Sequence, residues 1–108
     1  MAGIKIIGLG KSQGDKVVTN DDLAQIVDTS DQWVRAKTGI KSRYFAENKT
    51  NEDMAFEAAS QAIENAGIDR KEIAMCIVCT FTPDDYTPAV ACNVAGRLGL
   101  LEQIQAYD

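Results

Sequence analysis

Hydrophobic and polar positions follow two rhythms along the chain, one typical of strands and one typical of helices. Short apolar runs predict strands at residues 4–7, 17–18, 73–80 and 104–107. Apolar residues spaced by three or four predict helices that begin after Thr19 or Asn20, Ser30, Thr50 and Thr87. This alternation indicates an α/β protein with a mostly parallel sheet covered by helices on both faces.

The clearest helix begins at Thr50 and ends at Gly67. Thr50 and Asp53 have the spacing of a capping box, and alanines recur at helical intervals behind them. The strand at residues 73–80 is a continuous apolar run, which is typical of a central strand covered on both faces. A loop at residues 81–87 follows its carboxyl end, where open α/β sheets bind ligands. Thr87 is expected to cap the next helix, with Pro88 at its first position.

Two motifs point to chemistry that the surrounding pattern does not support. Gly8, Gly10 and Gly14 follow a predicted strand, but residues 11–18 lack the helix that a dinucleotide-binding loop requires. Cys76 and Cys79 have the spacing of a redox or zinc pair. On a strand, residues three apart point to opposite faces, so we interpret both as small core residues and predict no metal site. Residues 43–49 are polar and are expected to be irregular.

The stretch from residue 28 to 43 holds the only tryptophan. Ser30 is a helix-start residue and Gly39 can close a helix in the left-handed conformation. Between them, Trp33 and Lys37 are four residues apart and share a helix face. A flat ring beside a cation would suit an adenine that carries phosphates. The alternative is that Trp33 is a core anchor, which is the usual role of a lone tryptophan.

The charge of the chain supports a nucleotide-binding role for Trp33 and Lys37 only in part. The net charge of the chain is −5, which argues against a nucleic-acid-binding protein. Residues 35–49 nevertheless carry a net charge of +4 and would attract a polyanion, although a solvated basic loop explains them equally well. No apolar stretch approaches the ~20 residues that span a bilayer. No signal peptide is evident in the sequence, and we expect a cytoplasmic protein without membrane contact.

The motif Asp-Thr-Ser-Asp-x-Trp, followed after four residues by Thr-Gly-Ile-x-x-Arg, resembles the N-terminal signature of β-ketoacyl-acyl-carrier-protein synthase III. The resemblance spans the whole chain and implies a thiolase-like fold, with residues 1–108 as an incomplete N-terminal domain. It departs from the family near Gln13 and Gly14, where a Leu-Pro pair is usual.

The resemblance also implies roles for individual residues. Thr29 and Trp33 match positions that contact the adenine of coenzyme A, Trp33 by stacking. Lys37 stands where the family commonly has an arginine that meets the phosphates, and lysine lacks the bidentate fork of that arginine. Thr87 matches a phenylalanine that shortens the acyl pocket across the dimer interface in acetyl-primed members.

The implied reaction condenses an acyl-CoA primer with malonyl-acyl carrier protein, with coenzyme A as part of the substrate and no further cofactor. Its nucleophilic cysteine is expected just beyond Asp108, and its histidine and asparagine in the family's second half. No catalytic residue is assigned within this chain, which contains no histidine. A homodimer is implied.

Two other functions remain open from the sequence. A condensing enzyme of the polyketide or alkylquinolone type would share these motifs. A truncated, non-catalytic module could bind coenzyme A or a partner subunit without performing chemistry.

Overall fold

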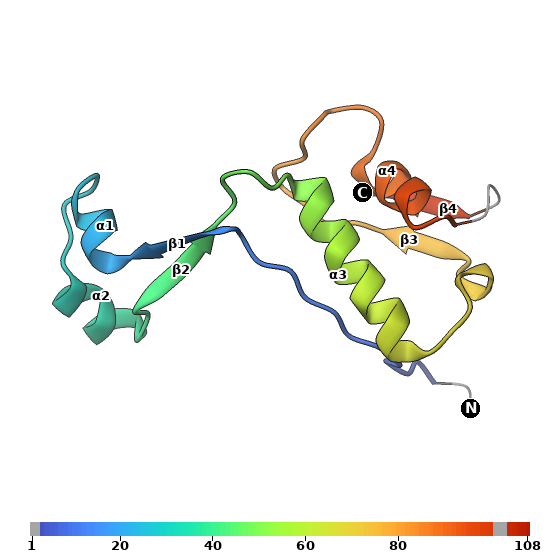
Figure 1. Ribbon diagram of the computed structural model, residues 1–108, viewed down its shortest axis with the longest axis horizontal. Helices are drawn as coiled ribbons and strands as arrows, with labels where there is room; N and C mark the ends of the chain where they lie inside the picture. The colour runs from blue at the N-terminus through green and yellow to red at the C-terminus, as the bar shows by residue number, and fades with distance from the viewer. Residues whose placement is uncertain (1–2, 101–103) are drawn as a thin grey trace. The chain divides into compact units, whose positions relative to one another are not determined.

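The computed structural model describes residues 3–100 and 104–108, which form two compact units (Figure 1). One unit is Gln13–Lys49. The other joins the segment that ends at Ser12 to the part that begins at Thr50. Each unit contains its own pair of strands and its own helices.

Two strands and two helices make up the unit Gln13–Lys49. The strands pair antiparallel, with Lys16 opposite Phe45 and Thr19 opposite Ser42. The helices form the connection between the strands. In chain order the elements are β1 (Lys16–Thr19), α1 (Asn20–Ala24), α2 (Asp31–Thr38) and β2 (Ser42–Phe45).

The start of α1 confirms the prediction of a capped helix after β1. The Thr19 hydroxyl accepts a hydrogen bond from the Asp22 amide at 3.1 Å, and the Asp22 carboxylate accepts one from the Thr19 amide at 2.8 Å. This reciprocal box satisfies two amides that a helix end leaves unpaired. The expectation of irregular chain is wrong for residues 43–45, which belong to β2, and is confirmed for residues 46–49. The partner strand of β2 is more than 20 residues away, so no local pattern marked it.

The carboxylate of Asp15 joins the two ends of this unit through hydrogen bonds. It accepts hydrogen bonds from the amide of Glu47 at 2.7 Å and from that of Asn48 at 3.0 Å. These amides, led by that of Glu47, lower the pKa of Asp15 from 3.8 to about 2. Because the folded pKa lies below the unfolded one, the bonds stabilise the fold fully above pH ~4 and progressively less as the pH falls toward 2.

We therefore expect Asp15→Asn to destabilise the complete protein at pH 6 and to make progressively less difference from pH 4 downward. Urea unfolding of both forms between pH 6 and pH 3 measures the two free energies of unfolding. Asp85→Asn serves as the control, because the described residues give the Asp85 carboxylate no hydrogen bond. A difference between wild type and Asp15→Asn that stays constant over this range would contradict the assignment.

The second unit contains the parallel strands. β3 and β4 pair with Met75 opposite Gln105 and Ile77 opposite Tyr107. This pairing confirms the α/β class and the parallel direction that the sequence predicts. The elements are α3 (Asn51–Ala66), the 3₁₀ turn η1 (Arg70–Glu72), β3 (Met75–Ile77), α4 (Val90–Arg97) and β4 (Gln105–Tyr107).

The core of the second unit lies between α3, α4 and one face of β3. Val90, Val94 and Leu98 are at most 2% exposed, and Phe56 of α3 and Cys76 of β3 pack against them. The apolar face predicted for α4 is therefore confirmed. The opposite face of β3 differs from the expectation of burial on both sides. Met75 and Ile77 are 48% and 59% exposed, because no described helix covers that face.

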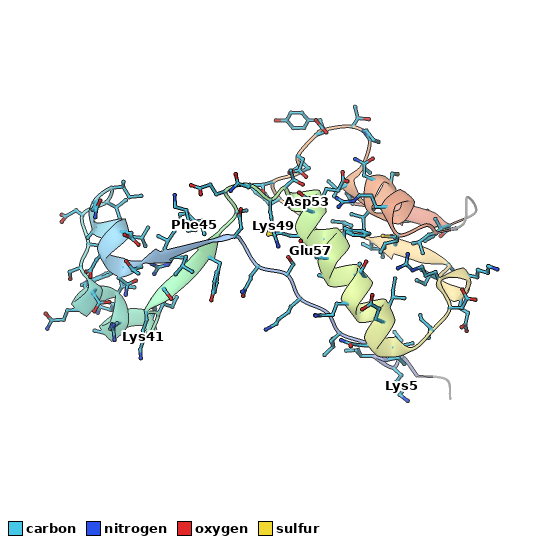
Figure 2. The ribbon with its side chains drawn as sticks, viewed as in Figure 1. Lys5, Lys41, Phe45, Lys49, Asp53 and Glu57 are labelled. Atoms are coloured by element: carbon cyan, nitrogen blue, oxygen red, sulfur yellow. The ribbon has the colours of Figure 1, made fainter. Side chains whose placement is uncertain are left out.

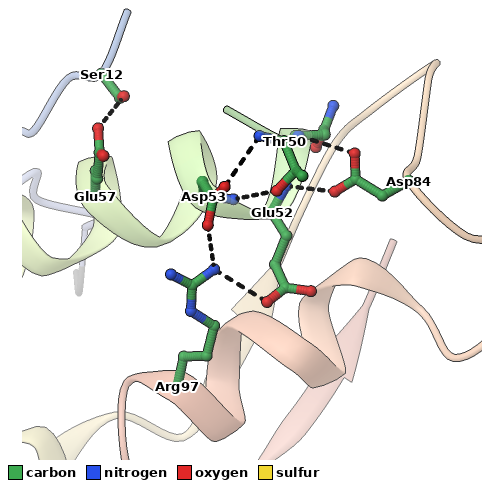
Figure 3. A network of polar contacts seen from close by, with 8 residues as sticks. Ser12, Thr50, Glu52, Asp53, Glu57, Asp84 and Arg97 are labelled. Atoms are coloured by element: carbon green, nitrogen blue, oxygen red, sulfur yellow. Dashed lines mark hydrogen bonds and ion pairs between the residues drawn. The ribbon is translucent and has the colours of Figure 1, made fainter. Parts of the chain in front are cut away.

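The first turn of α3 collects several polar contacts (Figure 3). Thr50 and Asp53 form the predicted capping box. The Asp84 carboxylate accepts hydrogen bonds from the amides of Asn51 and Glu52, at 2.9 and 2.7 Å. Arg97 of α4 donates to Glu52 at 3.0 Å and to Asp53 at 2.9 Å. These contacts attach the loop after β3 and the end of α4 to the same helix start.

The segment at residues 3–11 contains no strand, so the expectation for residues 4–7 is wrong. No described strand lies beside it to complete a hydrogen-bonded ladder. It runs instead along α3, where the Asn65 side chain donates to the Leu9 carbonyl at 2.8 Å and the Ser12 hydroxyl to Glu57 at 2.6 Å. A Cβ atom at Gly8 or Gly10 would collide with the α3 backbone. This close approach explains the glycines that resemble a dinucleotide loop.

The start of α4 also differs from the sequence prediction. The helix begins at Val90, and Thr87 does not cap it. The Asp108 carboxylate accepts hydrogen bonds from the amides of Val90 and Ala91, both at 2.7 Å. Asp108 follows β4, so the cap of α4 comes from a neighbouring strand rather than from the preceding residues.

Within the described residues, no helix is both long enough and apolar enough to cross a membrane.

Candidate functional site

The tryptophan helix α2 has the boundaries that its sequence predicts. The Ser30 hydroxyl accepts a hydrogen bond from the Trp33 amide at 3.2 Å, and Gly39 closes the helix with a φ of 73°. Trp33 is 59% exposed. Among the described residues the indole is not buried in a core and offers an open apolar surface. Its role in the complete protein stays a prediction.

A shallow hollow of about 300 Å³ lies beside this indole. It is lined by Asp28, Thr29, Ser30 and Trp33. The Thr29 hydroxyl oxygen is shielded from solvent and has no hydrogen-bond partner among the described residues. A polar atom left in this state costs about 1–3 kcal/mol, which a suitable ligand or protein group would offset. The hollow thus has an aromatic wall, whereas the unsatisfied Thr29 oxygen beside it is closed to solvent.

The basic side chains on α2 and in the connection after it differ in whether an acidic partner holds them. Arg35 donates to Asp31 at 2.8 Å, which lowers the pKa of the Asp31 carboxyl, with a further contribution from the Asn20 amide. Lys37 is exposed and makes no hydrogen bond or ion pair with any described residue. Lys41 lies in the connection between α2 and β2 (Figure 2). Lys37 is therefore available to an anion, although it does not line the hollow.

The structure brings together two of the four predicted site residues. Thr29 and Trp33 line one hollow, and Lys37 lies on the same helix as Trp33. Thr87 belongs to the other unit, in the loop between β3 and α4, where its side chain is exposed. Phe81 and Tyr86 in that loop are both 100% exposed, so neither of them fills space around Thr87.

The three cysteines have different environments. Cys76 is partly buried, and this burial raises the pKa of its thiol, as do the nearby Asp108 carboxylate and Cys92. Cys79 and Cys92 are exposed, so the interpretation of Cys79 as a core residue is wrong. It follows the short strand β3 instead of lying inside a buried strand. The described residues contain no cluster of three or more histidine, cysteine or acidic side chains that could hold a metal ion.

Sequence reasoning missed two residues of this unit. Asp28 lines the hollow and opens the signature motif, so its position was the available signal. Asn20 is only 1% exposed, although the sequence suggested it merely as a possible helix cap. Its partners lie 11 to 23 residues away, so sequence spacing gave no sign of them.

Sequence comparisons find relatives over nearly the whole chain. The β-ketoacyl-[acyl-carrier-protein] synthase III of Clostridium acetobutylicum is 46% identical over 99 residues, covering 92% of this chain and 30% of that protein. The enzyme of the same name from Campylobacter fetus is 43% identical over 109 residues, covering 100% of this chain and 33% of that protein. No family model matches the sequence. The chain spans about a third of the length of these relatives.

Solved structures give the same result. The 3-oxoacyl-[acyl-carrier-protein] synthase III of Aquifex aeolicus aligns with a TM-score of 0.91 and 39% identity, over 98% of this chain and 34% of that one. The priming β-ketosynthase of the R1128 polyketide pathway aligns with a TM-score of 0.85 and 29% identity, over 96% of this chain and 32% of that one.

The fold therefore places the chain in the class of thiolase-like α/β proteins. Within that class, the chain is a relative of the β-ketoacyl-[acyl-carrier-protein] synthases III and corresponds to their N-terminal part.

Proposed function

We propose that these residues are the N-terminal part of an acyltransferase that condenses an acyl-CoA primer with malonyl-acyl carrier protein and so starts fatty acid synthesis. The observation that carries the proposal is the 46% identity to a β-ketoacyl-[acyl-carrier-protein] synthase III over 92% of the chain. The acyl group would pass to a cysteine thiolate as coenzyme A leaves. Malonyl would then lose carbon dioxide, and the resulting carbanion would attack the thioester.

The contribution of this chain to that reaction is the binding of coenzyme A. The exposed indole of Trp33 would stack on the adenine ring, since base–aromatic stacking is worth about 1–3 kcal/mol per base. Thr29 lines the same hollow, and the resemblance to the synthases implies that it contacts the adenine. Lys37, one turn further along α2, would meet the phosphates as a point charge.

The catalytic groups of the proposed enzyme are assigned to the remainder of the protein. The nucleophile would be a cysteine just beyond Asp108, and the histidine and asparagine would come later in the sequence. We also propose a cytoplasmic homodimer, as the resemblance to the synthases implies. No cofactor other than the coenzyme A thioester is needed.

The function is tested with the complete protein, acetyl-CoA and malonyl-acyl carrier protein. The proposal expects one 3-ketoacyl-carrier protein and one carbon dioxide for each coenzyme A released. Mass spectrometry of the carrier protein measures the ketoacyl product, and a thiol assay measures the coenzyme A released. Binding of coenzyme A without any ketoacyl product would contradict the proposal and favour a non-catalytic module.

A polyketide-type condensing enzyme is the second candidate, favoured by the alignment to the R1128 priming β-ketosynthase. The two candidates differ in the carrier protein that accepts the new chain. Comparing a fatty-acid carrier protein with a polyketide carrier protein in the same assay separates them. Preference for the polyketide carrier protein would favour polyketide priming over fatty acid synthesis as the function of the protein.

We expect Thr87→Phe to restrict the complete enzyme to short primers. Threonine leaves room that a phenylalanine ring would fill, and each buried methylene of an acyl chain is worth about 0.8 kcal/mol. A series of acyl-CoA primers from acetyl upward, measured as kcat/KM for both forms, checks this. Thr82→Phe, in the same loop, is the control. If the wild type already rejects primers beyond about four carbons, the extra room does not exist.

A further inference from the structure

Asn20 is the one polar side chain that is buried among residues 3–100 and 104–108, at 1% exposure. Its amide nitrogen donates to the Asp31 carboxylate and to the Ile40 carbonyl, both at 2.8 Å. Its oxygen accepts from the Arg43 guanidinium at 2.6 Å. Both amide hydrogens and the carbonyl oxygen are thus satisfied, as a buried side chain requires.

These partners lie at the two ends of the tryptophan helix. Asp31 is the first residue of α2, and Ile40 follows Gly39, the residue that closes it. One side chain therefore holds the start and the exit of α2 at the same time. Arg43 also donates to the Val18 carbonyl at 3.2 Å, so the network reaches β1 and β2.

The network accounts for the part of the signature motif that the coenzyme A assignment leaves unused. Thr29, Trp33 and Lys37 are the motif residues assigned to the proposed ligand. Asp31, Ile40 and Arg43 belong to the same motif and all converge on Asn20. Asp31 in turn holds Arg35 at 2.8 Å, one turn along the helix.

We propose that Asn20 is a positioning residue for the proposed coenzyme A site at Thr29 and Trp33. By fixing both ends of α2, it sets the place of the Trp33 indole relative to Thr29, without touching the ligand. This inference rests on the proposed function, because it assumes that Trp33 stacks on coenzyme A. A binding site keeps its affinity only when the groups around it hold the contacting side chains in place.

The test uses the complete protein with Asn20→Ala, Trp33→Ala and the double variant. Calorimetry gives the Kd for coenzyme A, and initial rates give kcat and KM for acetyl-CoA. We expect Asn20→Ala to raise Kd and KM roughly tenfold with kcat unchanged, within the coupling seen between residues of one network. In the Trp33→Ala background, Asn20→Ala should add nothing further, because the side chain through which it acts is absent.

Asn65→Ala is the matched control, since it removes one side-chain hydrogen bond, to the Leu9 carbonyl, in the other unit. It should leave Kd unchanged. If Asn20→Ala fails to fold, Arg43→Lys carries the same expectation, because a single ammonium nitrogen replaces the two guanidinium nitrogens that donate to Asn20 and to the Val18 carbonyl.

Three results would overturn the inference. One is an Asn20→Ala protein that melts earlier but binds coenzyme A with the Kd of the wild type, which makes the residue purely structural. The second is an effect of Asn20→Ala that persists in full without Trp33. An unchanged Kd in Trp33→Ala would remove the stacking site itself, and the inference with it, while ketoacyl product from the same protein would leave the proposed condensation standing.

Discussion

Replacing Trp33 with alanine is expected to weaken the binding of acyl-CoA to the complete protein by about 1–3 kcal/mol, the usual worth of a base–aromatic stack. The indole is 59% exposed and lines the hollow that also holds Thr29, so its loss removes a ligand surface more than a packing contact. Because little buried area is lost, the midpoint of thermal unfolding should change little. Calorimetric titration and thermal unfolding of the same sample measure both quantities.

Tyr44→Ala is the matched control for this experiment. Tyr44 is an aromatic residue of the same unit, is 51% exposed and does not line the hollow. Its replacement should leave the Kd for acyl-CoA unchanged. A lower unfolding midpoint in Trp33→Ala with unaltered affinity would show instead that the tryptophan packs against the remainder of the protein.

Gly10→Ala is expected to destabilise the complete protein by about 1–3 kcal/mol, the usual cost of overpacking a closely fitted contact. A methyl group at this position would collide with the Ala58 carbonyl and approach the Ala62 amide nitrogen to 2.6 Å. Both atoms belong to the backbone of α3 and cannot rotate away. Urea unfolding measures the change in the free energy of unfolding.

Gly96→Ala provides a control of opposite sign. Gly96 lies inside α4, and a Cβ atom there would have no described atom within 4 Å apart from its chain neighbours and the adjoining backbone of its own helix. Alanine in a helix interior is favoured over glycine by about 0.5–1 kcal/mol. Equal effects of the two substitutions would mean that Gly10 is not held against α3.

The helix starts could be predicted because their determinants are local. At Thr19, Ser30 and Thr50 the capping oxygen and the amide that it accepts from are three residues apart. The pairing of Thr29 with Trp33 in one hollow is predictable for a similar reason, since both belong to the first turns around α2. These features depend on a few consecutive residues.

The predictions that were wrong share a cause. Each concerns a feature that depends on residues far away in the sequence. β2 forms because β1 lies beside it. Residues 4–7 do not form a strand, because no described strand lies beside them. Thr87 has the residue type of a cap, but Asp108 performs that role from 18 residues further along the chain. Asn20 gives no sequence signal of its burial, because its partners converge on it only in the folded unit.

The bond between Asp108 and α4 has a consequence for synthesis on the ribosome. The last residue of this sequence caps a helix that begins 18 residues earlier. At an elongation rate of roughly 5–20 residues per second, the residues of α4 wait about one to four seconds for their cap to be made. A helix of eight residues is marginal by itself. Until Asp108 is made, α4 is therefore held by its contacts with α3 and β3, which precede it in the chain, and its first amides lack the cap.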